Sequence, residues 1–261
     1  MSLAMLEEAR KEGVEEAILT FHFYPEEPDQ LERAKDAFEK LNIALGRPAD
    51  AASSEGSAES AGGEKLEALK NPTQQLQASQ QVAADISKAP RLQLGNEILF
   101  DSRSLEHVQS GRALTLADSR YVLLEFMPSD PYEKLEKAVR SFRMAGYRPV
   151  LAHVERYSAL RLDEIMPIKQ LIEGGAIIQV NARNFDTGRF DLAGSKKQKK
   201  LIHLIELGLV HVIADDSHNL DERKPCMGTV MDKLRSKGLD EKTINRIFYE
   251  NPRKILRNES I

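Results

Sequence analysis

Short apolar runs alternate with stretches of helical periodicity along most of this chain. The apolar runs predict six strands, at residues 17–21, 92–98, 121–126, 149–154, 176–181 and 210–215. Apolar residues at helical spacing predict helices between them, at residues 132–145, 163–173 and 199–207. Strands that alternate with helices form parallel βαβ units, so the pattern predicts an α/β fold with a sheet covered by helices.

Further helices are predicted at both ends of the chain. One runs from residue 3 to Gly13, and the next begins with Asp29 as its N-cap. Two more are expected to close the chain, the second beginning near Asp240 and ending before Asn251 and Pro252.

The six predicted strands are one short of a small closed barrel. The missing strand would most naturally come before Leu3. Without it the strands at 17–21 and 210–215 have unpaired edges, which favour aggregation or pairing with another chain. We therefore expect a barrel that lacks its first strand, with a tendency to form a homo-oligomer.

The composition changes between residues 46 and 90. Residues 46–65 carry no apolar side chain larger than alanine apart from Pro48. Such a segment buries too little surface to offset the entropy lost on ordering, so we predict a polar, largely flexible insertion. The expected organisation is one barrel domain made of residues 1–45 and 91–261, interrupted by the insertion at 46–90.

Charge and cysteine content exclude several classes of protein. The 37 Lys and Arg residues against 41 Asp and Glu residues give a net charge of -4, which argues against a nucleic-acid-binding face. The single cysteine, Cys226, excludes a disulfide framework and a zinc site of several thiolates, and suits a cytoplasmic protein. No apolar run approaches the roughly 20 residues that span a bilayer, so membrane insertion is not expected.

Polar residues gather at the C-terminal ends of the predicted strands. In parallel α/β folds these ends meet at one edge, where active sites lie, so we expect the side chains to converge. Imidazole and carboxylate together bind Mn²⁺, Fe or Zn²⁺, and clustered metals suit an in-line phosphoryl displacement. Arginines beside such a cluster suit phosphate oxygens. The residues are His22, Glu97, Glu125, His153, Glu155, Arg156, Asp216 and His218.

Each of these residues, taken singly, has an ordinary structural explanation. A lone histidine or carboxylate at a strand end is commonly a cap or a satisfied polar group, and a lone arginine such as Arg156 is commonly a surface ion pair of little energy. The convergence of several on one edge is what favours a functional site.

Other titratable residues have weaker contexts. His107 is expected at the surface, and His211 lies at the wrong end of its strand. His203, on the apolar face of a helix, is expected to be packed or partly buried. Cys226 has no histidine nearby in the sequence and is not expected to be a nucleophile. Tyr157 suits either packing or stacking on an aromatic substrate.

Several segments together resemble a known family. They are TFHFYPE (20–26), LGNEILF (94–100), DSRYVLLEF (118–126), RPVLAHVERY (148–157), IIQVN (177–181), VIADDSHNLDERKP (212–225) and NPRKIL (251–256). In this order they are similar to the CpsB/CapC/YwqE-type bacterial tyrosine phosphatases of the PHP (polymerase and histidinol phosphatase) superfamily. The resemblance covers nearly the whole chain outside the segment around residues 46–90.

The resemblance implies a fold, a cofactor and an activity. The fold is a distorted (β/α)7 barrel with up to three metal ions, usually Mn²⁺, with Fe or Zn²⁺ as alternatives. The activity is hydrolysis of phosphotyrosine on proteins, typically on the tyrosine autokinase that controls capsule or exopolysaccharide synthesis, by a metal-bound hydroxide. Arg156 and Arg223 would hold the phosphate. The implied metal ligands are His22, Glu97, Glu125, His153, Asp216 and His218.

The chain also departs from the family pattern. The family normally opens with a strand carrying a His-x-His pair and an acidic loop, which this sequence does not contain, so fewer than three ions are expected. Phe21 stands where a proline usually precedes the histidine. Two alternatives therefore stay open: a PHP phosphoesterase that acts on a small phosphate ester, and a catalytically impaired relative that only binds phosphoproteins.

Overall fold

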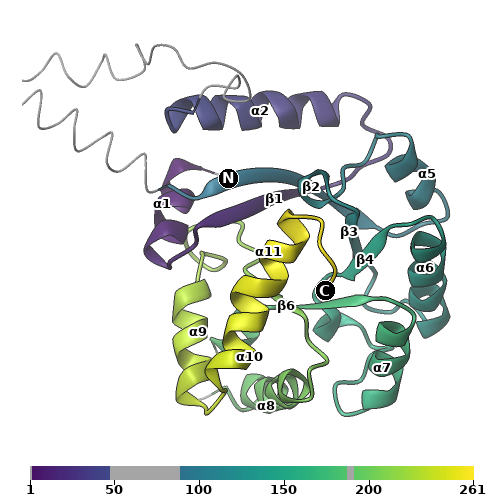
Figure 1. The fold of residues 1–261 in the computed structure, drawn as a ribbon, viewed down its shortest axis with the longest axis vertical. Helices are drawn as coiled ribbons and strands as arrows, with labels where there is room; N and C mark the ends of the chain where they lie inside the picture. Colours follow the sequence, from purple (N-terminus) through teal and green to yellow (C-terminus); the bar gives the residue numbers. More distant parts are fainter. Residues whose placement is uncertain (1, 48–88, 187–190) are drawn as a thin grey trace, which may run out of the picture.

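Six parallel strands form one curled sheet in the order β1-β2-β3-β4-β5-β6, which confirms the predicted strand number and direction (Figure 1). The computed structural model describes residues 2–47, 89–186 and 191–261. Every neighbouring pair of strands is parallel. The strands are β1 (Glu16–His22), β2 (Arg91–Leu99), β3 (Tyr121–Glu125), β4 (Arg148–Leu151), β5 (Ile177–Asn181) and β6 (Val212–Ala214).

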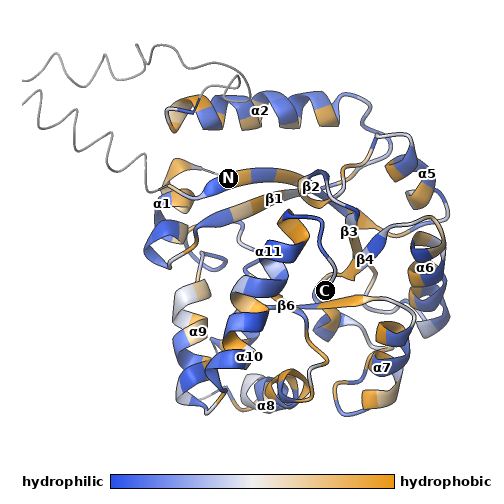
Figure 2. Cartoon of the chain, viewed as in Figure 1, coloured by the Kyte–Doolittle hydropathy of each residue, from blue (hydrophilic) through white to orange (hydrophobic). Residues whose placement is uncertain are grey.

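Helices surround the sheet, and Figure 2 shows hydrophobic residues running along the strands while the helices mix hydrophobic and hydrophilic positions. In α6 the apolar residues Leu135, Ala138, Val139 and Phe142 recur at helical spacing and are buried against the sheet layer. The helices are α1 (Leu3–Lys11), α2 (Gln30–Ala44), α5 (Ser104–Gln109), α6 (Tyr132–Met144), α7 (Ile165–Glu173), α8 (Leu192–Glu206), α9 (Met227–Ser236), α10 (Glu241–Asn245) and α11 (Asn251–Leu256).

Two apolar clusters lie on opposite faces of the sheet. Val122 and Leu124 belong to the large cluster under the outer helices, whereas Tyr121 and Leu123 belong to a smaller cluster inside the curl. This division follows the period of two along a strand. Ile255 of α11 joins the inner cluster, so the C-terminal helix helps to fill the interior.

Several predicted boundaries were wrong for local reasons. The strand predicted to run to residue 154 ends at Leu151, because His153 has a left-handed backbone with φ of 33°. The helix predicted from residue 199 begins at Leu192, because the Asp191 side chain caps it by accepting from the N–H of Gly194. Asp29 precedes α2 as predicted, but its side chain makes no capping hydrogen bond.

The end of the chain was also predicted wrongly. Asp240 caps α10 as expected, accepting from the N–H of Thr243, but the helical path does not stop before Asn251. A π-helical turn at Arg246–Glu250 joins α10 to α11, and Pro252 falls in the first turn of α11. Pro252 removes one backbone N–H from this continuous helical path, directly after the π-helical turn.

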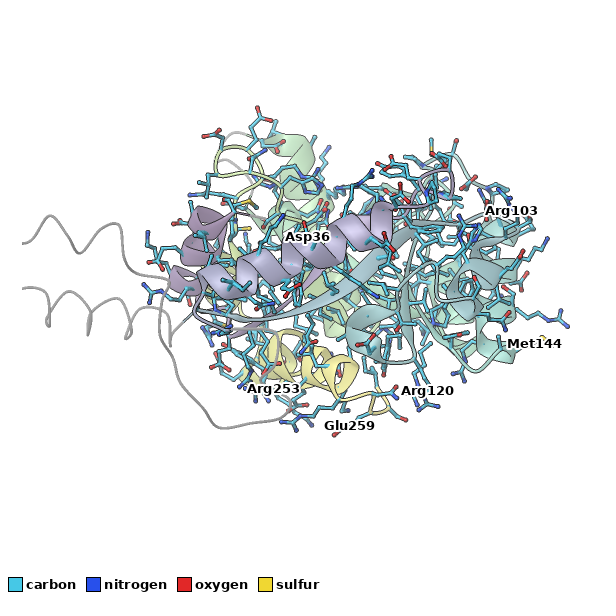
Figure 3. All side chains as sticks on the ribbon, turned by 90° about the horizontal axis from the view of Figure 1, so that it is seen from above. Asp36, Arg103, Arg120, Met144, Arg253 and Glu259 are labelled. Carbon is cyan, nitrogen blue, oxygen red and sulfur yellow. The ribbon has the colours of Figure 1, made fainter. Side chains whose placement is uncertain are left out.

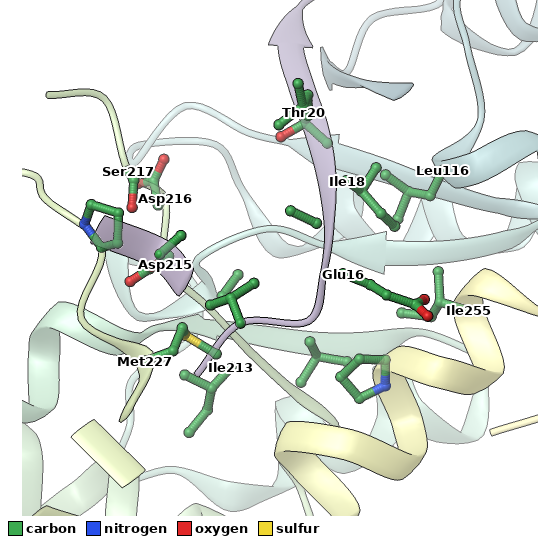
Figure 4. Close-up of a pocket in the computed structure, with 18 of the residues that line it drawn as sticks. Glu16, Ile18, Thr20, Leu116, Ile213, Asp215, Asp216, Ser217, Met227 and Ile255 are labelled. Carbon is green, nitrogen blue, oxygen red and sulfur yellow. The ribbon is translucent and has the colours of Figure 1, made fainter. Parts of the chain in front are cut away.

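β1 and β6 are the two edges of the sheet in the described part of the chain. A cavity of about 740 Å³ lies between them, lined by Ile18 and Thr20 of β1 and by Ile213 of β6 (Figure 4). β1 is only half-buried, in contrast to the fully buried β5. The sheet in these residues is therefore an open half-barrel.

The predicted insertion at 46–90 lies mostly outside the described residues. Its two described ends meet, because the guanidinium group of Arg47 donates to the carbonyl oxygens of Ala89 and Pro90 at 2.6 and 2.8 Å. Seen from above, α2 crosses over the strands, and Arg103 and Met144 lie at the right-hand end of the molecule (Figure 3). Among the described helices, none is both long and apolar enough to cross a membrane.

Candidate functional site

Three ligand-type side chains meet where β1, β2 and β3 end. His22 is the last residue of β1 and pairs in register with Glu97 of β2, while Glu125 is the last residue of β3. The Nδ1 atom of His22 lies 3.7 Å from Oε2 of Glu97 and 3.6 Å from Oε2 of Glu125. One ligand atom from each residue lies within 4.8 Å of the others, a spacing that a single metal ion can bridge.

His153 completes this group from the loop after β4. Its Nε2 atom lies 3.0 Å from Oε1 of Glu97 and 3.2 Å from Oε1 of Glu125, so one imidazole bridges both carboxylates. The left-handed backbone of His153, which is unusual for a residue other than glycine, turns the chain here. We call His22, Glu97, Glu125 and His153 the carboxylate–histidine cluster.

The ionised side chains of this cluster stabilise one another. Burial lowers the pKa of His153, but hydrogen bonds to Glu125 and Glu97 outweigh burial and raise the pKa to about 9. The hydrogen bond from His153 is the main reason that the pKa of Glu125 is lowered. Without a metal, a protonated imidazole therefore stands between two carboxylates.

A second group surrounds Asp216, just after β6. Its Oδ2 atom lies 2.7 Å from a guanidinium nitrogen of Arg156 and 2.5 Å from one of Arg223. The amide of Asn181 donates to the same oxygen at 2.7 Å. Both predicted phosphate-binding arginines thus converge on one predicted metal ligand, so their guanidinium groups lie side by side.

The surroundings of Asp216 keep it ionised. Burial raises its pKa, but the charges of Arg223 and Arg156 and the hydrogen bond from Asn181 outweigh burial and lower it. His218 lies on the other side, with Nδ1 at 3.7 Å from Oδ1 of Asp216. We call Asp216, His218, Arg156 and Arg223 the aspartate–arginine cluster.

The two clusters open onto the same cavity. His22 and Glu97 line it from the first cluster, and Asp216 and His218 line it from the second. Figure 4 shows Asp215, Asp216 and Ser217 at the edge of this cavity, across from Thr20. Eight of the nine predicted site residues therefore lie in these two adjoining clusters, at the C-terminal edge of the sheet. The ninth, Glu155, belongs to neither cluster and accepts a hydrogen bond from the Asn184 amide.

The donor set fits a divalent metal ion. Two carboxylates and two imidazoles are ligands that Mn²⁺, Fe and Zn²⁺ accept, and the thiolates that would favour a softer metal are missing from the two clusters. The Nδ1 atom of His153 is buried and has no partner among the described residues, so this histidine is held through Nε2 alone. The negative charges of the neighbouring Glu97 and Glu125 carboxylates would neutralise the positive charge of such an ion.

Sequence reasoning missed the polar residues that support Asp216. Asn181, at the end of β5, is only 5% exposed, and Asn184 donates both to the carbonyl oxygen of Asn181 and to the Glu155 carboxylate. The sequence predicts a strand at IIQVN (177–181), but an asparagine at a strand end carries no signal for a partner 35 residues away.

Three histidines lie outside the two clusters. His107 was predicted at the surface, which is wrong, since it is 4% exposed and packs on Phe23. His203 was predicted to be packed, which is also wrong, because its side chain is 58% exposed. His211 lies just before β6, away from the site as predicted, where burial lowers its pKa to about 4.

Cys226 and Tyr157 have structural surroundings. Burial, together with the nearby Asp215 carboxylate, raises the pKa of the Cys226 thiol to about 12, which argues against a nucleophilic role. The Tyr157 hydroxyl donates to the carbonyl oxygen of Ala152 at 2.6 Å, and its ring packs against Phe126. Of the two roles open to Tyr157, its 3% exposure supports packing.

Comparison with known proteins places these features in a family. A family model described as "Capsular polysaccharide synthesis, CpsB/CapC" matches residues 60–257. The tyrosine-protein phosphatase CpsB of Streptococcus pneumoniae is 34% identical over 182 residues, which cover 69% of this chain and 74% of that protein. The tyrosine-protein phosphatase YwqE of Bacillus subtilis (strain 168) is 27% identical over 167 residues, covering 64% of this chain and 63% of that protein.

A solved structure agrees with this relationship at the level of the fold. It comes from work on YwqE from Bacillus subtilis and CpsB from Streptococcus pneumoniae, which are described there as metal-dependent tyrosine phosphatases. The TM-score is 0.71 at 21% identity, over 99% of this chain and 87% of the other. Since the family model spans most of the chain, this protein belongs to the CpsB/CapC family of capsular polysaccharide synthesis.

Proposed function

We propose that this protein is a metal-dependent phosphatase that hydrolyses phosphotyrosine on proteins. The observation that carries the proposal is the meeting of the carboxylate–histidine cluster with two converging arginines at one cavity. Membership of the CpsB/CapC family supports the same activity, because the relatives are tyrosine-protein phosphatases.

The proposed roles follow from the chemistry of each side chain. Arg156 and Arg223 present permanently charged, planar groups that suit the oxygens of a phosphate monoester, which would compete with Asp216 for them. A bound divalent metal supplies Lewis acidity toward the phosphoryl group and lowers the pKa of a coordinated water. The proposed metal ligands are His22, Glu97, Glu125, His153, Asp216 and His218.

We propose Mn²⁺ as the metal, with Fe or Zn²⁺ as alternatives, because a set of carboxylates and imidazoles without thiolates suits these ions. The proposed substrate is a phosphotyrosine-bearing protein of capsule or exopolysaccharide synthesis, in particular a bacterial tyrosine autokinase. The proposed location of the present protein is the cytoplasm. The family description and the names of the relatives support the capsule setting. Self-association through the sheet edges stays a prediction.

Phosphate release from a phosphotyrosine peptide tests the proposal directly. The wild-type protein is assayed with added Mn²⁺ and after chelation, and His153→Ala serves as the blank, because it removes the imidazole that joins Glu97 to Glu125. We expect Mn²⁺-dependent release that both chelation and the variant reduce by about 100-fold or more. Release that is unchanged in His153→Ala would contradict the proposed site.

A parallel assay with small alkyl phosphates separates the alternatives. A metal-dependent phosphoesterase for small substrates would turn these over at least as well as the peptide. A protein that only binds phosphotyrosine would retain the peptide without releasing phosphate. Either result would overturn the proposed activity.

A further inference from the structure

We propose that Asn181 is a positioning residue, whose buried amide holds the Asp216 carboxylate in the orientation that metal binding requires. This inference rests on the proposed function, because it takes Asp216 as a metal ligand. Asn181 is not among the site residues that the sequence predicts. The inference gives the C-terminal end of β5 a role in the site.

The pairing of β5 with β6 brings the two residues together. Asn181 is the last residue of β5 and pairs in register with Ala214, the last residue of β6. Asp216 follows two residues later, with a left-handed backbone at φ of 52°, and its carboxylate reaches the Asn181 amide at 2.7 Å. The amide is therefore anchored on the sheet, whereas the carboxylate begins the loop beyond it.

Oδ2 of Asp216 has three donors, and they differ in mobility. The side chains of Arg156 and Arg223 are 40% and 35% exposed, and they are long and flexible. The whole Asn181 residue is 5% exposed, and its carbonyl oxygen is tied to the Asn184 amide at 2.9 Å. When the guanidinium groups turn toward a phosphate, the amide is the donor that stays on Asp216.

The amide also sets which carboxylate oxygen is available. Because Asn181 holds Oδ2, the other oxygen, Oδ1, is left on the side of His218. A neutral donor does this without adding a positive charge that would repel a metal ion. A side chain that positions a metal ligand acts in this way, because it binds one carboxylate oxygen and leaves the other free for the metal.

The other end of the Asn181 amide indicates that stability alone does not explain the residue. Its Oδ1 atom is buried and has no partner in the described part of the chain. An unpartnered buried acceptor destabilises a folded protein, because it loses its hydrogen bonds to water and gains none in the protein. The residue therefore carries an energetic penalty on one side, while its other side makes a single short hydrogen bond to Asp216.

Mn²⁺ binding by Asn181→Leu tests the inference without any substrate. Leucine keeps the approximate volume and removes the donor. Gln179→Leu is the matched control, because Gln179 lies on the same face of β5, is 7% exposed and makes no hydrogen bond to Asp216 among the described residues. We expect the Kd for Mn²⁺, measured by calorimetry, to rise about 10–100-fold in Asn181→Leu and to stay near wild type in the control.

Turnover supplies a second readout that a purely structural role would not move. Excess Mn²⁺ is expected to restore most of the kcat of Asn181→Leu for a phosphotyrosine peptide, because the defect lies in metal affinity. If Asn181→Leu does not fold, Asn181→Ala, which adds no bulk, is held to the same criteria. A Kd for Mn²⁺ within about threefold of that of Gln179→Leu would overturn the inference.

The Mn²⁺ titration also separates this inference from the proposed function. If the wild type binds Mn²⁺, Asn181→Leu binds it more weakly, and neither hydrolyses phosphotyrosine, then the inference holds and the proposed activity fails. If the wild type hydrolyses phosphotyrosine and both leucine variants bind Mn²⁺ equally, then the inference alone fails.

Discussion

The Nε2 atom of His153 lies 3.0 Å from Oε1 of Glu97, although 56 residues separate them along the chain. Glu97 comes from within β2, and His153 comes from the turn after β4. The contact exists because parallel strands bring their C-terminal ends to one edge of the sheet. It places a raised-pKa imidazole between carboxylates that would otherwise repel each other.

This arrangement predicts that metal removal destabilises the protein. A metal bound at about 100 times its Kd adds about 2.7 kcal/mol to the free energy of unfolding, provided that the unfolded chain does not bind it. We expect thermal unfolding to shift upward with Mn²⁺ and back with a chelator. Glu97→Gln should lose most of the Mn²⁺ effect, whereas Glu106→Gln, at an exposed position of α5, should keep it. An equal Mn²⁺ shift in both variants would argue against a metal at Glu97.

The converging guanidinium groups predict a substrate-binding role for both arginines. Arg156→Lys and Arg223→Lys keep the charge but lose the planar, bidentate group, so we expect KM for a phosphotyrosine peptide to rise about tenfold in each. Because both side chains contact Asp216, the double variant should deviate from additivity. Arg103→Lys, which changes an exposed arginine that belongs to neither cluster, is the control. Unchanged KM values in both single variants would contradict the assignment.

The lowered pKa of His211 predicts that the free energy of unfolding falls at acidic pH. Its folded-state pKa of about 4 is below the ordinary value of 6.5, so the unfolded chain takes up a proton first as the pH falls. The contribution to stability is therefore complete above the ordinary pKa and is lost as the pH falls toward the folded-state pKa. At about pH 5 the loss is about 2 kcal/mol relative to neutral pH.

Urea unfolding at the two pH values checks this prediction. His211→Gln removes the titrating group, so its stability should fall less between neutral pH and about pH 5 than that of the wild type. His203→Gln, whose side chain is exposed, should follow the wild type. Identical pH dependence in the wild type and His211→Gln would show that His211 does not titrate in this range.

A close approach between α1 and α9 predicts a steric effect at Gly228. A Cβ atom there would lie 2.6 Å from the carbonyl oxygen of Glu12, whose carboxylate accepts from the backbone and side chain of Thr229. Gly228→Ala should therefore lower the free energy of unfolding by about 2 kcal/mol, measured by urea titration. Ser236→Ala, at the exposed end of α9, should change it by less than about 0.5 kcal/mol. Equal effects of both changes would contradict the steric explanation.

The sequence by itself determined the strands, their parallel direction and the edge at which the site residues gather. These features follow from local patterns: apolar runs for buried strands, helical spacing between them, and polar residues at strand ends. The resemblance of short segments added the expected roles of His22, Glu97, Glu125 and His153. Their meeting at one edge follows from the parallel topology alone.

The tertiary structure alone decided which side chains touch. Arg156 and Arg223 meet on Asp216, and Asn181 supports it, through contacts that join residues far apart in the chain. The same holds for burial: His107 is enclosed by packing on Phe23, while His203 stays exposed on α8, beside Glu206. Local propensity carries no information on such contacts, because they depend on how separate elements pack together in space.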